Sequence, residues 1–244
     1  MIGSENEATK RNGEGPDLTV SDAPIPEAVD SPDRPRTNAE LREEAIRRMT
    51  LTAIRLIAEH GAAKLSLVDV GREAGFSHSL PNYYFGSKKG LLLHVYSFLV
   101  HSARGKIIRW WQTRQLGHIR PGLPNIRATI QGYLGLVEHD PAPSRAWHVL
   151  WSESISSMPE LLEVVRTMNR RFVDFVVHAL QVAIERGEAD PDIDVEALAL
   201  LLAASVRGVV AQYMVDPERV DPQRIADALI MLLNRGVAMK TNIT

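Results

Sequence analysis

The chain has no cysteine among its 244 residues. This absence excludes disulfide bonds, thiolate metal ligands and cysteine nucleophiles together. Apolar residues are not scarce, and at 45% of the sequence they are enough to bury a large core in one or two domains. We therefore expect a globular protein without covalent cross-links.

A long uninterrupted apolar run is also missing. The richest stretch, Leu198 to Val210, is shorter than the ~20 apolar residues that a membrane helix needs, and Arg207 interrupts it. The N-terminal segment lacks the apolar core of a signal peptide. The sequence thus predicts a cytoplasmic protein with no membrane partner.

Common catalytic motifs are absent. The chain has no GxSxG, GxxxxGK[ST], GxGxxG or HExxH motif and no ExxH pair for a carboxylate-bridged metal site. His94 and His101 share one helical face, but two turns separate them, which is too far for one metal ion on a straight helix. We expect no catalytic residue, no metal site and no cofactor, so an enzyme is not the favoured interpretation.

Strand signals are missing throughout. No alternating apolar pattern, hairpin signal or internal repeat occurs, whereas apolar residues recur at helical spacing from residue 39 onward. Capping residues, glycines and prolines divide this region into segments. The fold class is therefore all-α, with helices expected at about 38–60, 66–74, 77–84, 87–115, 124–139, 144–156, 159–186, 194–214 and 221–235.

The net charge of −2 is divided unevenly along the chain. Residues 1–38 carry eight acids and four bases, are rich in Pro, Gly, Asp, Glu and Ser, and are expected to form a disordered tail. Residues 39–90 carry six acids and eight bases, and residues 91–244 are balanced. Any nucleic-acid binding by residues 39–90 should therefore depend on a few placed contacts and not on a broad basic field.

Residues 66–85 read as two short helices that meet at a glycine turn. Ser66 and Asp69 have the spacing of a capping box, and Ser77 is placed to cap the second helix. Gly75 stands where a helix that has just ended needs a left-handed residue. A DNA-binding helix-turn-helix requires such a turn, but an ordinary helical hairpin has the same signature. Spacing alone leaves both interpretations open.

Residues 40–100 also resemble the N-terminal DNA-binding domain of the tetracycline-repressor (TetR) family. Two positions depart from the family pattern, because Gly71 replaces the usual alanine and Pro81 replaces an aliphatic residue in the presumed recognition helix. The resemblance implies a three-helix DNA-binding domain at 39–90, followed by a helical effector-binding and dimerisation domain at 91–244. The matching residues are Gly75, Ser77, Tyr84, Phe85, Lys88, Gly90 and Leu91.

The resemblance identifies the helix from Ser77 to about Tyr84 as the one that enters the major groove of double-stranded DNA. Asn82 would pair with adenine and Leu80 would touch a thymine methyl, while Tyr84 and Lys88 would bind phosphates. Arg42, Arg47 and Arg48 either face solvent or reach phosphates. The expected DNA-binding residues are Ser66, Ser77, His78, Ser79, Leu80, Asn82, Tyr83, Tyr84 and Lys88.

A tryptophan-rich segment is the candidate effector site. Trp147 and Trp151 lie four residues apart on one helical face, a spacing that suits either core packing or a ligand box. The segment around them also resembles the C-terminal domain of the choline-responsive repressor of the glycine betaine pathway. Aromatic faces attract quaternary ammonium groups, so the effector is expected to be apolar or a quaternary ammonium compound. The expected ligand-binding residues are Trp110, Tyr133, Trp147, Trp151 and Glu153.

The last two predicted helices carry the candidate dimer interface. The helix 194–214 is apolar nearly all round, so it must be covered on more than one side. Either both helices complete the core of one chain, or they pair with a second copy as a four-helix bundle, as TetR-like proteins do. The bundle is favoured because a helix-turn-helix protein generally reads two half-sites as a dimer. The expected interface residues are Leu200, Ala204, Gly208, Ala211, Ile225, Leu229 and Leu232.

These observations favour a homodimeric, ligand-responsive transcriptional regulator. The resemblance implies a repressor that binds a palindromic operator and is released by a small molecule. The alternative is a helical small-molecule-binding or scaffold protein that does not bind DNA.

Overall fold

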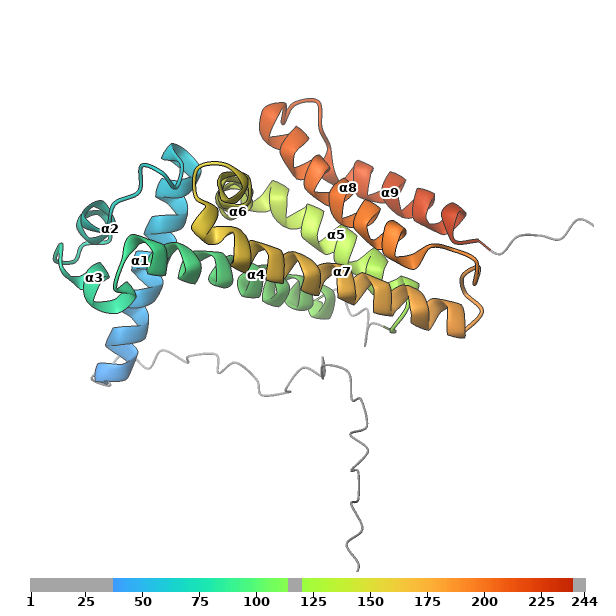
Figure 1. The fold of residues 1–244 in the computed structure, drawn as a ribbon, viewed down its shortest axis with the longest axis horizontal. Coiled ribbons are helices and arrows are strands. Elements are labelled where there is room, and N and C mark those ends of the chain that lie inside the picture. Colours follow the sequence, from blue (N-terminus) through green and yellow to red (C-terminus); the bar gives the residue numbers. More distant parts are fainter. Residues whose placement is uncertain (1–36, 114–119, 239–244) are drawn as a thin grey trace, which may run out of the picture. The chain divides into compact units, whose positions relative to one another are not determined.

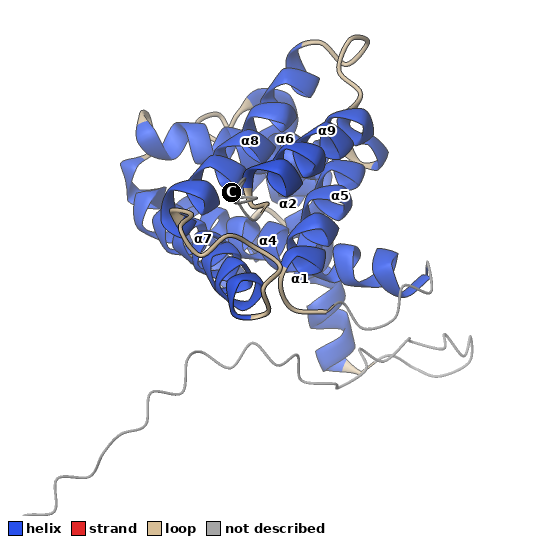
Figure 2. Ribbon diagram, turned by 90° about the vertical axis from the view of Figure 1, so that its right-hand side faces the viewer, coloured by secondary structure: helices blue, strands red, loops and turns tan. Residues whose placement is uncertain are grey.

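The computed structural model describes residues 37–113 and 120–238, and within these residues every regular element is a helix (Figure 2). The all-α fold class is therefore confirmed. Except for Thr37 and Asn38, the tail that was expected to be disordered lies outside the described residues, and so does the side chain of Trp110.

The first three helices form the small N-terminal bundle of Figure 1. They are α1 (Asn38–His60), α2 (Leu67–Glu73) and α3 (Leu80–Phe85). The apolar face of α1 supplies Met49 and Ile57, and Val70 of α2 packs in the same cluster, all three fully buried. Because α2 and α3 are too short to be stable alone, their helical form depends on this packing against α1 and the start of the next helix.

Gly71 and Pro81, the two positions that depart from the TetR-family pattern, lie against each other. A Cβ atom added to Gly71 would lie 2.8 Å from the carbonyl oxygen of Ser77 and 3.2 Å from the ring carbons of Pro81. Pro81 occupies the first turn of α3, where a missing N–H breaks no helical hydrogen bond. The small residue on α2 therefore makes room for the proline on α3.

Gly71→Ala is expected to destabilise the protein by about 1–3 kcal/mol, because the new methyl group would push against backbone. The matched control is Gly105→Ala, whose Cβ would lie 3.8 Å from the nearest side-chain atom. That substitution should be neutral or stabilise by up to ~1 kcal/mol, the usual helical preference for alanine. Chemical denaturation of both variants measures the difference, and equal stabilities would contradict the close contact.

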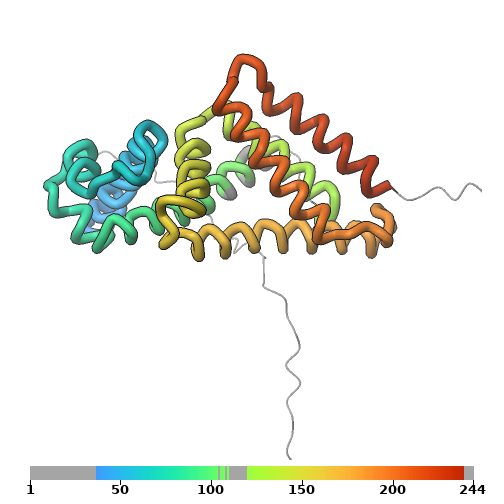
Figure 3. Tube along the Cα trace, turned by 45° about the horizontal axis from the view of Figure 1, so that its top comes forward, coloured from blue at the N-terminus to red at the C-terminus, as the bar shows by residue number. Residues whose placement is uncertain are grey.

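Six further helices follow α3 within the described residues, and the first of them begins after only Gly86 and Ser87. They are α4 (Lys88–Thr113), α5 (Leu123–His139), α6 (Pro141–Ile155), α7 (Leu162–Glu185), α8 (Val195–Val215) and α9 (Pro222–Gly236), with a 3₁₀ turn at Pro159–Leu161. Figure 3 shows α4 leading from the N-terminal helices to the C-terminal ones. The expected bounds are close, although α6 begins three residues earlier and the turn Pro159–Leu161 precedes α7. Asp194 and Asp221 cap α8 and α9 through their side chains, as their sequence positions indicate.

Two apolar clusters hold these helices together. The first contains the buried faces of α1, α2 and the start of α4, and it continues into α6 and α7 through Leu150 and Val165. The second lies among α5, α7, α8 and α9, with Leu134, Leu180 and Val210 fully buried. The helix-turn-helix and the C-terminal helices therefore share the first cluster, and α6 packs directly on α1.

Helix α8 is more apolar than the sequence analysis allowed. By length and composition it is a candidate membrane span, with a mean hydropathy of 1.7, because one arginine does not lower the average far. Only 33% of its apolar 18-residue stretch is buried within the chain. Much of the apolar surface of α8 is therefore left uncovered within one chain.

Candidate DNA-binding and effector sites

The start of the helix-turn-helix is set by the predicted cap, Ser66. The Ser66 hydroxyl accepts a hydrogen bond from the Asp69 backbone N–H at 3.1 Å and donates one to the Asp69 carboxylate at 2.5 Å. This second bond, helped by Arg72, holds the pKa of Asp69 below its usual range. The hydroxyl of Ser66 is thus already engaged within the protein.

The turn itself is fixed by Gly75 and by an arginine from α1. Gly75 has a φ of +76°, which L side chains rarely adopt, as the sequence predicts. The Arg48 guanidinium donates to the Ala74 carbonyl at 2.7 Å and lies 4.8 Å from the centre of the Phe76 ring. Arg48 therefore braces the turn between α2 and α3, a role that the sequence analysis missed because the two partners are 26 residues or more away.

The recognition helix begins later than predicted. Helix α3 starts at Leu80 with Ser79 as its N-cap, and neither Ser79 nor Ser77 caps it through a side chain. The prediction that Ser77 caps this helix is therefore wrong, because the hydroxyls of the two serines face each other at 3.3 Å. The turn between the two helices is correspondingly longer.

One side of this segment points to solvent. Tyr83 is 79% exposed, and Asn82 beside it is also exposed. His78 and Ser79, in the turn before α3, are exposed as well. We call His78, Ser79, Asn82 and Tyr83 the recognition face. All four were expected to contact DNA, and their side chains are free of the apolar core.

Three other expected DNA-binding residues are held by the protein. Leu80 and Tyr84 are half-buried against the first apolar cluster, so Leu80 is poorly placed to reach a thymine methyl. The Arg42 guanidinium lies 5.7 Å from the Tyr84 ring. The Lys88 ammonium donates to the Ala63 carbonyl at 2.6 Å. A phosphate bound by Lys88 must share or replace that bond.

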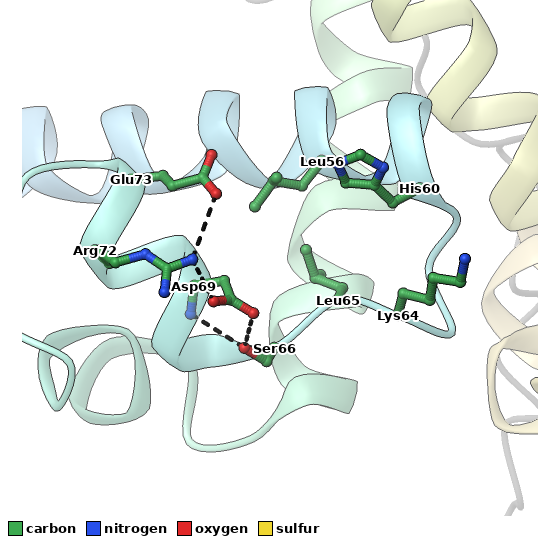
Figure 4. Close-up of a pocket in the computed structure, with 8 residues that line it drawn as sticks. All are labelled: Leu56, His60, Lys64, Leu65, Ser66, Asp69, Arg72 and Glu73. Carbon is green, nitrogen blue, oxygen red and sulfur yellow. Dashed lines mark hydrogen bonds and ion pairs between the residues drawn. The ribbon is translucent and has the colours of Figure 1, made fainter.

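A polar hollow of about 270 Å³ lies between the end of α1 and the start of α2 (Figure 4). Three of its ionic groups pair with one another, since Arg72 bonds Asp69 at 2.6 Å and lies 3.7 Å from Glu73. None of the expected effector residues lines it. The hollow is therefore distinct from the expected effector site.

Two tryptophans and two tyrosines meet among four helices and surround an arginine. The rings of Tyr133 on α5 and Trp147 on α6 are edge to face, with centres 6.4 Å apart. The Arg207 guanidinium on α8 lies 5.8 Å from the Trp147 ring centre and 5.6 Å from that of Trp151. Tyr96 on α4 adjoins Trp147. We call these five residues the aromatic cluster.

Arg207 is the cationic member of this cluster, and the sequence analysis treated it only as an interruption in an apolar run. Its guanidinium also donates to the Asn169 side-chain carbonyl on α7. Burial lowers its pKa, but an arginine remains protonated in any ordinary protein site. Burial also raises the pKa of Tyr96 to about 12 and that of Tyr133 further, so both hydroxyls are neutral at pH 7.

Glu153 does not join the aromatic cluster. It stands two positions after Trp151, with only Ser152 between them, so its side chain emerges on another side of α6. One of its carboxylate oxygens lies 3.1 Å from where a Cβ of Gly61 would stand, and the other is buried without a hydrogen-bond partner in the described part of the chain. The expectation that Glu153 balances a cationic ligand among the tryptophans is therefore wrong.

The expected dimer residues fall into two groups. Leu200 and Leu232 are 53% and 60% exposed, Ala204 is exposed, and Gly208 has open space where a side chain would stand. The other three are half-buried, and Leu229 packs on the second apolar cluster. Two exposed neighbours, Leu201 and Met231, were not among the expected interface residues. The half-buried residues of the expected set are Ala211, Ile225 and Leu229.

Comparisons with known proteins agree with this arrangement. The family model "Bacterial regulatory proteins, tetR family" matches residues 50–95, and "BetI-type transcriptional repressor, C-terminal" matches residues 124–236. The solved structure of a TetR transcriptional regulator from Chloroflexus aurantiacus superposes with a TM-score of 0.66 at 22% identity. The superposition covers 80% of this chain and 98% of the Chloroflexus aurantiacus chain, which shows that the two share a fold.

Curated relatives named HTH-type transcriptional regulator BetI extend the comparison. The chain is 41% identical to the protein of Agrobacterium fabrum over 63 residues, which are 25% of this chain and only 31% of that protein. It is 24% identical to BetI 1 of Chromohalobacter salexigens over 205 residues, which are 83% of this chain and 96% of that protein. The two family models together span the helix-turn-helix and the C-terminal helices, and the chain belongs to the TetR family of bacterial regulatory proteins.

Proposed function

We propose that the protein is a ligand-responsive, DNA-binding transcriptional regulator, most simply a repressor. The observation that carries this proposal is the recognition face, where Asn82 and Tyr83 project to solvent from a short helix that a fixed turn holds in place. A polar amide and an aromatic hydroxyl on an outward helix suit base edges in the major groove. The site of action would be chromosomal DNA in the cytoplasm.

The apolar stripe on α8 and α9 supports a homodimer. Leu200, Leu201 and Leu232 leave more than half of their surface uncovered, and small residues between them allow a second helix to approach closely. A two-fold dimer would present two recognition faces to a near-palindromic operator. The same uncovered stripe explains why so apolar a helix as α8 is only partly buried in one chain.

Helix α6 offers a route between effector and DNA. One side of α6 carries Trp147 and Trp151, and the helix also packs on α1, which holds the turn before the recognition face. A ligand that moves α6 would therefore displace α1. Shifting the dimer from 99% competent to 99% incompetent needs about 5.5 kcal/mol of differential ligand affinity.

Titration with fragmented genomic DNA at several salt concentrations separates this proposal from the alternative of a helical scaffold. A regulator should bind the mixture and lose affinity steeply as salt rises, because phosphate contacts release counterions. A protein that retains no DNA at low salt would overturn the proposal.

Lys88→Gln is expected to weaken binding to every DNA sequence alike and to lower the salt slope by about 1. Glutamine keeps a donor for the Ala63 carbonyl but removes the charge that a phosphate would use. The matched control is Lys89→Gln, an exposed neighbour in the same helical turn. Equal losses in the two variants, or a loss confined to one DNA sequence, would show that Lys88 makes no specific phosphate contact.

A further inference from the structure

The aromatic cluster contains a positive charge that the described protein does not balance. A guanidinium has five N–H donors, and Arg207 uses one on the Asn169 carbonyl. None of the ion pairs within residues 37–113 and 120–238 includes it. The hydroxyls of Tyr133 and Tyr96, which also lie near Arg207, are neutral at pH 7 and do not balance its charge. Because Arg207 is half-buried, its charge lies close to the surface with no carboxylate of the described residues to balance it.

This arrangement does not suit a quaternary ammonium effector. The faces of Trp147 and Trp151 that would attract a cation already have the Arg207 guanidinium within 6 Å of their centres. A second cation there would be repelled by the first. The carboxylate that was expected to compensate, Glu153, lies instead beside Gly61, the residue that follows α1. A ligand of the opposite charge would be attracted where a cation would not.

We propose that the effector is a small organic carboxylate with an apolar body, held by Arg207 and surrounded by the aromatic cluster. The planar guanidinium presents paired N–H groups that match the two oxygens of a carboxylate. The tryptophan and tyrosine rings supply apolar surface for the rest of the molecule. A carboxylate brings one negative charge to one guanidinium, whereas a phosphate monoester would bring close to two. The inference rests on the proposed function only in calling this ligand the effector.

Binding by the full-length protein without DNA tests the ligand class. The probes are two matched sets, phenylacetate with 2-phenylethanol and benzyltrimethylammonium, and hexanoate with hexanol and hexyltrimethylammonium. Tryptophan fluorescence and thermal unfolding follow each titration. At least one carboxylate should bind about tenfold or more tightly than its neutral and cationic counterparts. If no carboxylate binds at millimolar concentration, or the ammonium compounds bind more tightly, the proposal is wrong.

Variants tie the binding to Arg207. Arg207→Gln should lose tenfold or more of the carboxylate affinity, and Arg207→Lys should retain part of it because the charge remains. Arg170→Gln, an exposed arginine beside Asn169 on α7, should bind as the parent does. Carboxylate binding that survives Arg207→Gln overturns the assignment. If the Gln variant no longer folds, the Lys variant must still prefer carboxylates over the matched ammonium compounds, or the proposal falls.

The outcomes keep the ligand class and the proposed function apart. If carboxylate binding depends on Arg207 but the protein retains no DNA, the ligand class is supported and the proposed regulatory function is contradicted. DNA binding by a protein that ignores every carboxylate would do the reverse.

Discussion

Leu232→Glu is expected to turn a dimer into a monomer and to lower operator affinity by ~100-fold or more, since two linked recognition faces gain 10²–10⁴ in avidity. Leu232 is 60% exposed on α9 within one chain, so a carboxylate there would remain hydrated in the monomer. In a dimer, the same carboxylate would be buried against apolar side chains without a partner. The loss should therefore appear in assembly and DNA binding, with little change in the stability of the monomer itself.

Light scattering measures the oligomeric state and a DNA titration measures the affinity. Ile155→Glu is the matched control, because Ile155 is 64% exposed on α6 and lies outside the α8–α9 stripe. It should remain a dimer with parental affinity. A Leu232→Glu protein that stays dimeric would remove α9 from the interface, and an equal effect of Ile155→Glu would show that the stripe is not the cause.

Asn82→Ala is expected to relax base preference at one position in each half-site by about 1–3 kcal/mol, or roughly 5–150-fold in affinity. The amide of Asn82 is exposed on α3 and makes no side-chain hydrogen bond to the described residues, so its donor and acceptor are available to an adenine edge. Fold stability should change little, because surface substitutions of this kind usually do.

The measurement is a specificity profile, in which the variant and the parent are compared on single-base substitutions of the enriched site. Lys88→Gln is the informative comparison, because losing a phosphate contact should weaken all of these sequences equally. If Asn82→Ala also weakens them equally, the amide does not read a base. An unchanged profile would remove Asn82 from the recognition face.

Much of the fold follows from local signals in the sequence. Ser66, Asp194 and Asp221 are followed by helices that they cap through their own side chains, and Gly75 adopts the left-handed turn that its position demands. Such features depend on neighbours within a few residues. The start of α3 could not be placed the same way. Ser77 has the sequence position of a cap, but its hydroxyl lies against that of Ser79 and the helix begins at Leu80.

The effector site was also only partly predictable. Trp147 and Trp151 share one helical face, and that much is visible in their spacing. Arg207 reaches them from α8, and its partner Asn169 comes from α7, so nothing local to Arg207 marks its role. Glu153 is different, because its spacing from Trp151 already places it on another side of α6. That error could have been avoided from the sequence.

The sequence shows where α8 and α9 carry small and apolar residues. It does not show which of these residues are buried within one chain. Leu229 and Ile225 turn partly inward against the second cluster, whereas Leu201 and Met231 remain exposed. Both sets fit an apolar helical face. Only the packing of α9 on α5 and α8 distinguishes them.

Selection of bound duplexes from a randomised pool, followed by sequencing, tests most directly whether the recognition face reads DNA as one half of a symmetric pair. We expect a near-palindromic sequence whose half-site centres are about 34 Å apart, one turn of the double helix, or a multiple of that distance. A pool that stays random, or a single asymmetric site bound by one chain, would contradict this account.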